Sequence, residues 1–266
     1  NNISLTGGGG DVSFIIGNSF ESGTGRGTIK SEQPSEVQNF VQIMQHPIGV
    51  TTTAKHLGYT SDPEMDKQRF ETGVDHAFAI EKTLFWGQRA QKNVGLFLGK
   101  FEQWWTGGVH DFISTNAVDA GGALTQSEFS SFLIQSTKYA KAPVVFASER
   151  LYEGLTQWAE TKLELVRNET TLGMAVAKYM TPYGDIIKVM PHRELLIDAL
   201  NKYGFCLDIS ELEYRFLAGL DTHVERDIQT PGDKQHIDEF RTWFGLKIGN
   251  EKRHGELFNI TSISNA

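Results

Sequence analysis

The sequence lacks the features on which disulfide-stapled, membrane-spanning and nucleic-acid-binding proteins depend. Its single cysteine, Cys206, excludes an internal disulfide framework and fits folding in a reducing cytoplasm. No run of 18 apolar residues and no charged leader before an apolar segment is present, so neither a membrane span nor a secretory signal is visible. The net charge of -8 argues against a dedicated binder of the nucleic-acid backbone.

Catalytic and cofactor motifs are also missing from the sequence. The histidines never form His-Glu-x-x-His, and no serine lies in a Gly-x-Ser-x-Gly elbow. Gly23, Gly25 and Gly27 are not followed directly by the Lys and Ser or Thr of a phosphate-binding loop, so we interpret them as part of a flexible loop. These absences favour a structural role. We therefore expect no enzyme activity, no cofactor and no metal site.

Three acidic residues and two other reactive side chains are the remaining candidates for chemistry. Asp208, Glu211 and Glu213 have the spacing of paired acids, but we favour the solvated edge of a strand over metal binding. Cys206 lies in an apolar strand pattern, where cysteine usually packs as a small hydrophobe. His76 is expected to be a surface or packed residue rather than a ligand.

The stretch from Asp62 to Gln91 is predicted to form one long helix of roughly 43 Å. Asp62 is a capping residue type, Pro63 suits the first helical position, and acidic residues follow in the first turn. Apolar residues then recur at helical spacing and gather on one side, which we expect to be buried. This stripe consists of Phe70, Val74, Ala77, Phe78, Leu84 and Phe85. The pattern fits either an ordinary core helix or a spine shared by separate lobes.

Residues 1–58 are predicted to form extended chain around a polar tip. Alternating apolar residues at 12–16 and 41–43 and a β-branched run at 50–53 favour strands. The segment between them, 17–34, is rich in Gly, Ser and Thr. We interpret this region as a long two-stranded arm with a mobile end. Because an isolated hairpin is marginally stable in water, the arm needs a neighbour to lie on.

Residues 115–200 are predicted to form a compact lobe in which helices cover a small sheet. Gly121–Gly122 marks a loop, and Thr125 and Glu128 have the Thr-x-x-Glu spacing of a capping box. The Pro-Tyr-Gly turn within 181–185 joins two alternating runs into a hairpin. This combination indicates a mixed α/β lobe.

The chain from about residue 203 onward is rich in strands. Apolar residues alternate at 205–209 and 212–216, and a turn at Pro231–Gly232 precedes a long strand at 239–248 that has one polar face. Long antiparallel strands after a long helix indicate an α+β layer.

Several stretches, although individually loose, follow one another in an informative order. They are Asn39-Phe-Val-Gln-Ile-Met44, Gly58-Tyr-Thr-Ser-Asp-Pro63 with the long helix, Trp104-Trp-Thr-Gly-Gly-Val109, Tyr183-Gly-Asp-Ile-Ile-Lys-Val189, Phe205-Cys-Leu-Asp-Ile209, Thr230-Pro-Gly-Asp233, and Glu239-Phe-Arg-Thr-Trp243 to His254-Gly-Glu-Leu257. Over nearly its whole length the chain thereby resembles the major capsid proteins of tailed bacteriophages, which have the Hong Kong 97-type fold.

The resemblance implies an α+β fold built from the parts of a Hong Kong 97-like capsid protein. These parts are an N-terminal remnant with an extended β-arm, the E-loop, at 1–58; a peripheral domain with the spine helix at 59–114; a mixed α/β axial domain at 115–202; and strands at 203–266 that return to complete the peripheral antiparallel sheet. The family's N-terminal arm is expected to precede residue 1. The E-loop tip would contact neighbouring subunits through Phe20, Glu21, Gly23, Gly25, Arg26, Gly27 and Lys30.

The function that the resemblance implies is structural. Copies of the chain would assemble as hexamers and pentamers into the icosahedral shell of the virion, in the host cytoplasm, and enclose DNA without sequence-specific binding. Portal, scaffold and decoration proteins are candidate further partners, and no membrane is expected. Two alternatives stay open: an encapsulin-like nanocompartment shell around protein cargo, and a soluble ligand-binding domain or enzyme that uses residues 115–200.

Overall fold

The computed structural model describes most of the chain, in two compact units. The described residues are 2–5, 14–18, 22–23, 25, 31, 36–57, 64–92, 101–158, 163–166, 176–181, 183–184, 186–197 and 199–264. The first unit comprises residues 1–38 and the second residues 39–266.

The first unit contains one antiparallel hairpin, made of β1 (Asn2–Leu5) and β2 (Phe14–Asn18). The strand at residue 14 was expected to pair with the strand near residue 42 to form the arm. That pairing is wrong, because each strand has another antiparallel partner: β2 pairs with β1, whereas β3 (Gln42–Thr51) pairs with β14 (Gln235–Ile248). The second pairing runs from Gln42 to Thr51 without interruption, which makes it much the longer ladder.

In the second unit, β14 is the central strand of a four-stranded antiparallel sheet. One side of β14 pairs with β3, and the other pairs with β12 (Leu212–Phe216) and β13 (His223–Glu225). The turn predicted before β14 is confirmed, since the Asp233 amide donates to the Thr230 carbonyl at 3.0 Å. The β-branched run at 50–53 does not continue as a strand, because β3 ends at Thr51 and a short helix, α1 (Thr52–Leu57), begins there.

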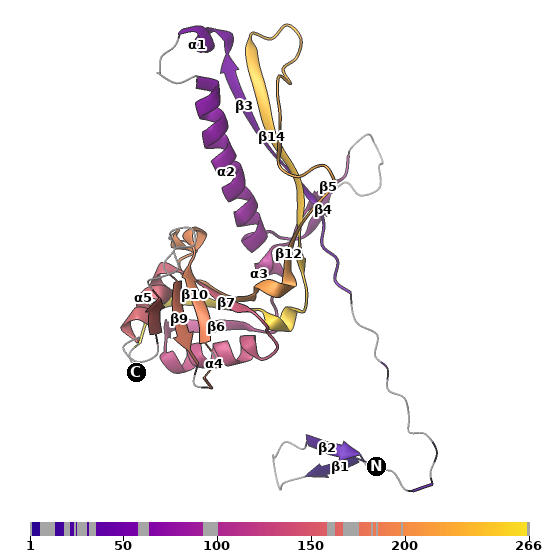
Figure 1. Cartoon of the computed structure of the whole chain (residues 1–266), viewed down its shortest axis with the longest axis vertical. Helices are drawn as coiled ribbons and strands as arrows, with labels where there is room; N and C mark the ends of the chain where they lie inside the picture. The colour runs from indigo at the N-terminus through magenta and orange to yellow at the C-terminus, as the bar shows by residue number, and fades with distance from the viewer. Residues whose placement is uncertain are drawn as a thin grey trace. The chain divides into compact units, whose positions relative to one another are not determined.

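The long helix exists, but it is shorter than predicted. It is α2 (Glu64–Trp86), which lies along β3 (Figure 1). The predicted start, Asp62 and Pro63, lies outside the described residues. The helix ends at Trp86 because Gly87 passes so close to the chain that a Cβ there would lie 2.5 Å from the Thr106 carbonyl oxygen. Residues beyond it form β4 (Ala90–Lys92), which pairs with β5 (Gln103–Trp105).

The predicted buried stripe of α2 is wrong in its N-terminal half. Phe85 is buried, but Phe70 is 75% exposed and Val74 is 39% exposed. The side chain that α2 buries in its middle is instead His76, which is 1% exposed. The helix is rotated in this way because His76 forms hydrogen bonds with β3 and β14, which a periodicity of apolar residues does not reveal.

The largest sheet among the described residues of the second unit has seven strands. In spatial order these are β6 (Ala117–Leu124), β15 (Gly255–Ile263), β11 (Gly204–Asp208), β7 (Pro143–Ala147), β10 (Ile186–Pro191), β9 (Val176–Met180) and β8 (Leu163–Val166). All strands after residue 203 were expected beside the long helix. That is correct for β12, β13 and β14 but wrong for β11 and β15, which lie in the seven-stranded sheet.

Two local predictions in this sheet have different outcomes. The Pro-Tyr-Gly hairpin is confirmed, since β9 and β10 are antiparallel and the Gly184 amide donates to the Thr181 carbonyl at 2.9 Å. The loop predicted at Gly121–Gly122 is wrong. Both glycines lie within β6, where φ angles of +59° and +106° accompany an irregular register with β15.

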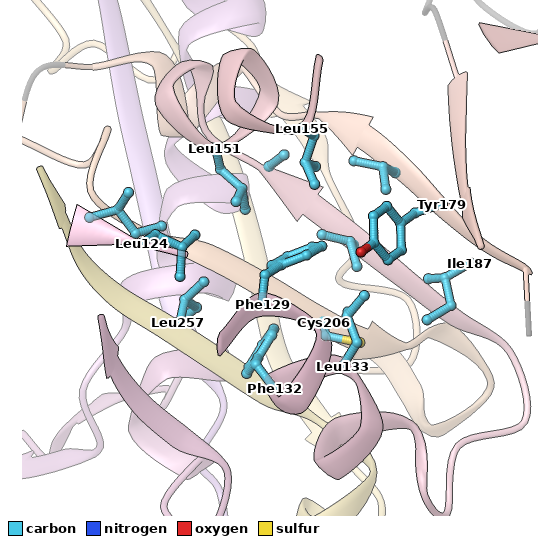
Figure 2. Packing of buried hydrophobic residues seen from close by; sticks show 14 of the residues in the cluster. Leu124, Phe129, Phe132, Leu133, Leu151, Leu155, Tyr179, Ile187, Cys206 and Leu257 are labelled. Atoms are coloured by element: carbon cyan, nitrogen blue, oxygen red, sulfur yellow. The ribbon is translucent and has the colours of Figure 1, made fainter. Parts of the chain in front are cut away.

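Two helices close the core of the lobe built on this sheet. They are α4 (Gln126–Thr137) and α5 (Glu149–Gln157), and their apolar side chains point into one cluster with those of the strands (Figure 2). The predicted capping box at Thr125 and Glu128 is confirmed, and Ser148 caps α5. Cys206 belongs to this cluster, where burial raises the pKa of its thiol to about 12. The cysteine is therefore a packing residue, as predicted.

Candidate functional site

The predicted contact residues at the E-loop tip are only partly described. Gly23 and Gly25 are exposed, Gly23 has a φ of +90°, and no described atom lies within 4 Å of the position that a Cβ would take at either glycine. Phe20, Glu21, Arg26, Gly27 and Lys30 lie outside the described residues. The role of these residues in contacts between subunits stays a prediction.

The point where the N-terminal unit joins the second unit is fixed by one side chain, Asn39. Its Oδ1 accepts hydrogen bonds from the Gly107 amide at 2.7 Å and from the Phe40 amide at 2.8 Å. Its Nδ2 donates to the Gly107 carbonyl at 3.0 Å and to the Leu246 carbonyl at 2.6 Å. Asn39 therefore holds the first residues of the second unit on β14 and on the loop before α3 (Val109–Phe112).

Neighbouring residues hold the same segment in place. The Phe40 ring lies 5.0 Å from the Trp104 ring, and the Gln42 side-chain oxygen accepts from the Thr106 amide at 3.3 Å. The Phe40 carbonyl oxygen comes within 2.8 Å of the position that a Cβ would take at Gly245, so this crossing requires glycine. We call Asn39 with these contacts the arm root. The sequence showed Asn39 only as part of a resembling stretch, without a role.

The C-terminal half of α2 contacts the seven-stranded lobe through charged and aromatic groups. Glu81 accepts from His192 at 3.0 Å, Lys82 lies 3.6 Å from Glu194, and the guanidinium of Arg193 lies 5.3 Å from the centroid of the Phe78 ring. The last two partners belong to a 3-10 turn, η1 (Arg193–Leu196). Phe78 is therefore only half-buried and has a cation beside it, whereas the sequence predicted a core position.

The short helix α3 contributes a second histidine to this region. His110 Nδ1 lies 2.8 and 2.9 Å from the two carboxylate oxygens of Glu256, which is 2% exposed. Burial raises the pKa of Glu256, although His110 acts in the opposite direction. His110 thus provides a hydrogen-bond partner for the buried Glu256 carboxylate. The Trp86 ring lies beside this pair, 5.3 Å from the His110 ring.

The acidic residues at 208–213 were expected at the solvated edge of a strand, which is correct for Glu213 on the edge strand β12 but wrong for Asp208. Asp208 is 0% exposed and accepts hydrogen bonds from the amides of Lys141 (2.8 Å), Ala142 (3.2 Å) and Ser210 (3.1 Å) and from the Ser210 hydroxyl (2.6 Å). Burial alone would raise the pKa of Asp208, but these hydrogen bonds hold it below its usual value. The prediction for Asp208 was wrong because two of the four donors, the amides of Lys141 and Ala142, come from a turn far away in the sequence.

Three segments that lead from one sheet to the other are connected near this carboxylate, and two of them contact it directly. The chain crosses before β6 at 114–116, at η2 (Ile209–Glu211) and at η3 (Glu251–Arg253). Arg253 pairs with Asp208 and Glu211, which connects the second crossing to the third. Glu251 accepts from the Ser114 and Thr115 amides, and Asn116 donates to the Lys252 and His254 carbonyls, which connects the third crossing to the first. We call this set of contacts the junction cluster.

Neither a metal site nor a membrane span is found in the part of the chain that the structure describes. No group of three or more His, Cys, Asp or Glu side chains there is arranged to hold a metal ion. No described helix has the length and apolar character needed to cross a membrane. The geometry therefore directs attention to surfaces and joints.

Comparison with known proteins agrees with the fold. The sequence profile of the SU10 major capsid protein family matches residues 17–261. A search of curated protein sequences found no match.

Three solved structures have the same arrangement of elements at very low identity. The SrpI encapsulin of Synechococcus elongatus PCC 7942 is 9% identical, with a TM-score of 0.55 over 85% of this chain and 77% of that chain. The structure from Mycobacterium phage Patience is 9% identical, with a TM-score of 0.51 over 94% of this chain and 77% of that chain. The capsid of a native GTA particle is 9% identical, with a TM-score of 0.51 over 90% of this chain and 81% of that chain.

The chain has the Hong Kong 97-like fold of these phage capsids. Because the family profile extends over most of its length, the chain belongs to the family of SU10 major capsid proteins.

Proposed function

We propose that each subunit builds the shell by extending its N-terminal unit, residues 1–38, onto a neighbouring subunit. A major capsid protein assembles with copies of itself into the shell of the virion. The observation that carries the proposal is the arm root, which fixes the start of the second unit at Asn39 while the hairpin of the first unit remains a separate compact unit. A two-stranded hairpin is marginal by itself, so a neighbour would supply its missing layer.

The strength of such a shell would come from repetition. Each arm adds one modest contact, and many contacts that must break together give a far more stable assembly than any one of them. We place the E-loop tip residues named above among these contacts. We keep the division into an arm, a peripheral and an axial domain, with β3 assigned to the peripheral sheet and β11 and β15 assigned to the axial lobe. Hexamers and pentamers are the assemblies that this arrangement would form.

The charge of the chain supports a container for DNA. A net charge of -8 limits electrostatic attraction to the phosphate backbone, so the shell would enclose DNA without binding it tightly. Portal, scaffold and decoration proteins are the further partners we propose. A structural family supports the expectation that the chain acts by association and not by catalysis.

Deleting residues 17–30 tests the proposal. The deletion removes the predicted contact tip and leaves the second unit intact, so circular dichroism should be close to that of the parent while negative-stain images lose most particles. A control replaces the same residues with a Gly/Ser segment of equal length; it should also fail if the tip side chains make the contacts. Normal particles from the deletion would exclude the arm as the connection between subunits.

An encapsulin-like shell is the second candidate, because the SrpI encapsulin shares the fold with a TM-score of 0.55. The contents of purified particles separate the two functions. Nuclease-protected DNA inside the shell is expected for a phage capsid, whereas a co-purifying protein in place of DNA would favour the nanocompartment. A stable monomer in light scattering would contradict both.

A further inference from the structure

Two histidines lie between the middle of α2 and the four-stranded sheet. His76 of α2 is 1% exposed, and its Nδ1 lies 2.7 Å from Nδ1 of His46 on β3. The two rings meet edge to face, at 89°. On its other side, Nε2 of His76 lies 2.7 Å from the hydroxyl of Thr242 on β14, which in turn donates to the Thr222 hydroxyl at 2.9 Å. One ring therefore connects the helix to two strands.

The directions of these hydrogen bonds define where the protons lie. Thr242 gives its hydrogen to Thr222, so it accepts from Nε2–H of His76. His76 then carries its lone pair on Nδ1 and accepts from Nδ1–H of His46. A proton on Nε2 of His46 leaves this chain of bonds in place. A proton on His76 must go to Nδ1, and it places two N–H groups head to head whenever His46 keeps its own Nδ1–H, as it does when both rings are charged.

The charged groups around the pair offer little compensation for a charged His76. On the same sides of α2 and β14, Arg69 and Asp238 are already paired with each other at 2.5 Å. On β3, His46 is the only ionisable side chain. The charged groups of β13 and β14 at His223, Glu225, Glu239 and Arg241 interact with one another and with Trp243, on the opposite face of the sheet. Asp75, next to His76 on α2, is exposed to solvent.

The C-terminal half of α2 faces the lobe through a different kind of contact. There His192 lies 3.0 Å from Glu81, so a charged His192 ring would face a carboxylate. Lys82 and Glu194 form a second ion pair across the same contact. The C-terminal half of α2 should therefore keep its contacts with the seven-stranded lobe in acid.

We propose that His46 and His76 form an acid-released latch that holds the N-terminal half of α2 on the four-stranded sheet. When His76 takes a proton, the latch opens and α2 pivots on its C-terminal half. Burial and, to a lesser extent, His46 lower the pKa of His76. The latched form thus excludes a proton that an open form binds at a pKa of about 6.5, so latching is complete above that pH and weakens below it.

Hydrogen–deuterium exchange of the purified full chain, followed by mass spectrometry, tests the latch. Exchange of peptides from 64–76 and from 77–86 is measured at pH 7.5 and 5.5 and normalised to the intrinsic rates. The population of the open form of the first segment should be about tenfold higher at pH 5.5 than at pH 7.5. The reason is that a histidine with a pKa of about 6.5 in the open form is mostly protonated at pH 5.5, and this proton binding stabilises the open form by about that factor. The second segment should change little.

Three substitutions complete the test. His76→Gln should abolish the pH response of the first segment. His46→Gln should weaken the response, because His76 Nδ1 then no longer faces the His46 ring. His56→Gln removes an exposed histidine of α1 and should leave the response unchanged. If His76→Gln does not fold, the His46→Gln result decides. A parent without a pH response, equal responses in both halves of α2, or a His46→Gln response equal to that of the parent would overturn the latch.

Discussion

A single buried carboxylate, that of Asp208, holds together residues that are far apart in the sequence. It accepts four hydrogen bonds from 141–142 and Ser210 and lies 3.8 Å from Arg253. Such a group is costly to bury and stabilises only when all its oxygen lone pairs are used. Asp208 therefore determines whether the junction cluster forms as a unit.

Asp208→Asn should lower the free energy of unfolding by about 2–4 kcal/mol, since an amide cannot accept all these bonds and Arg253 loses a partner. The lowered pKa of Asp208 means that its contribution is present above about pH 4 and is lost as the pH falls below that value, so the difference between variant and parent should shrink in acid. Urea denaturation at pH 7 and pH 3.5 measures both effects. Glu213→Gln, at an exposed ion pair, is the control and should be close to neutral.

At the scale of single elements, a short-range signal decides where α4 starts and a close approach of two glycines accompanies the end of α2. Thr125 and Glu128 bond each other's backbone amides at the start of α4. At the end of α2, Gly87 and Gly108 approach so closely that the Gly108 amide donates to the Gly87 carbonyl at 2.8 Å. The first arrangement is readable in the sequence, whereas the second requires two segments to meet in space.

Thr125→Ala should cost about 1 kcal/mol of unfolding free energy, because the amide of Glu128 loses its capping acceptor. Thermal unfolding followed by circular dichroism measures the loss. Ser131→Ala in the exposed middle of α4 removes a hydroxyl that bonds the Ser127 carbonyl and should have a smaller effect. An equal loss in both variants would mean that the cap contributes nothing specific.

Gly108→Ala should cost about 1–3 kcal/mol, because the new Cβ would lie 2.7 Å from the Gly87 nitrogen and from the Thr83 carbonyl oxygen. The matched control is Gly49→Ala in β3, where the nearest atom is 3.9 Å away. Chemical denaturation of the two variants should separate them clearly. Similar stabilities would show that the α2 end can move away from the loop without cost.

What the sequence could predict depended on the distance between partners along the chain. The capping box at Thr125 and Glu128 and the hairpin turn at 181–185 depend on neighbours within a few residues, and these predictions were confirmed. The facing of α2 depended on His76 and Thr242, and the burial of Asp208 on residues 141–142. Apolar periodicity carries no information about such distant polar partners, so Phe70 was placed inside and Asp208 outside.

At the scale of the whole molecule, the arm root fixes the first residues of the second unit, directly after the unit proposed to reach a neighbour. The Asn39 side chain is bonded to Gly107 and Leu246, next to the end of α2 and inside β14. Any displacement of the arm would therefore reach the helix and the central strand directly.

Asn39→Ala should weaken the arm root while most of the second unit stays folded. We expect a loss of about 1–3 kcal/mol from the amide and carbonyl groups left without partners, together with faster proteolysis at 36–41 and fewer particles. Limited proteolysis and electron microscopy of the full chain measure these effects. Gln42→Ala, which removes one longer hydrogen bond nearby, should be milder. Unchanged proteolysis and assembly in Asn39→Ala would contradict the role of the arm root.

The junction cluster also has a mechanical consequence. The four-stranded and seven-stranded sheets are connected by three covalent segments, at 114–116, 209–211 and 251–253. Hydrogen bonds and an ion pair join these segments to one another. A pull that separates the sheets loads these segments in parallel, so each carries only part of the force. Their cross-links prevent one segment from extending before the others. Under internal pressure, the subunit should therefore yield first where single strands carry the load, and last at this joint.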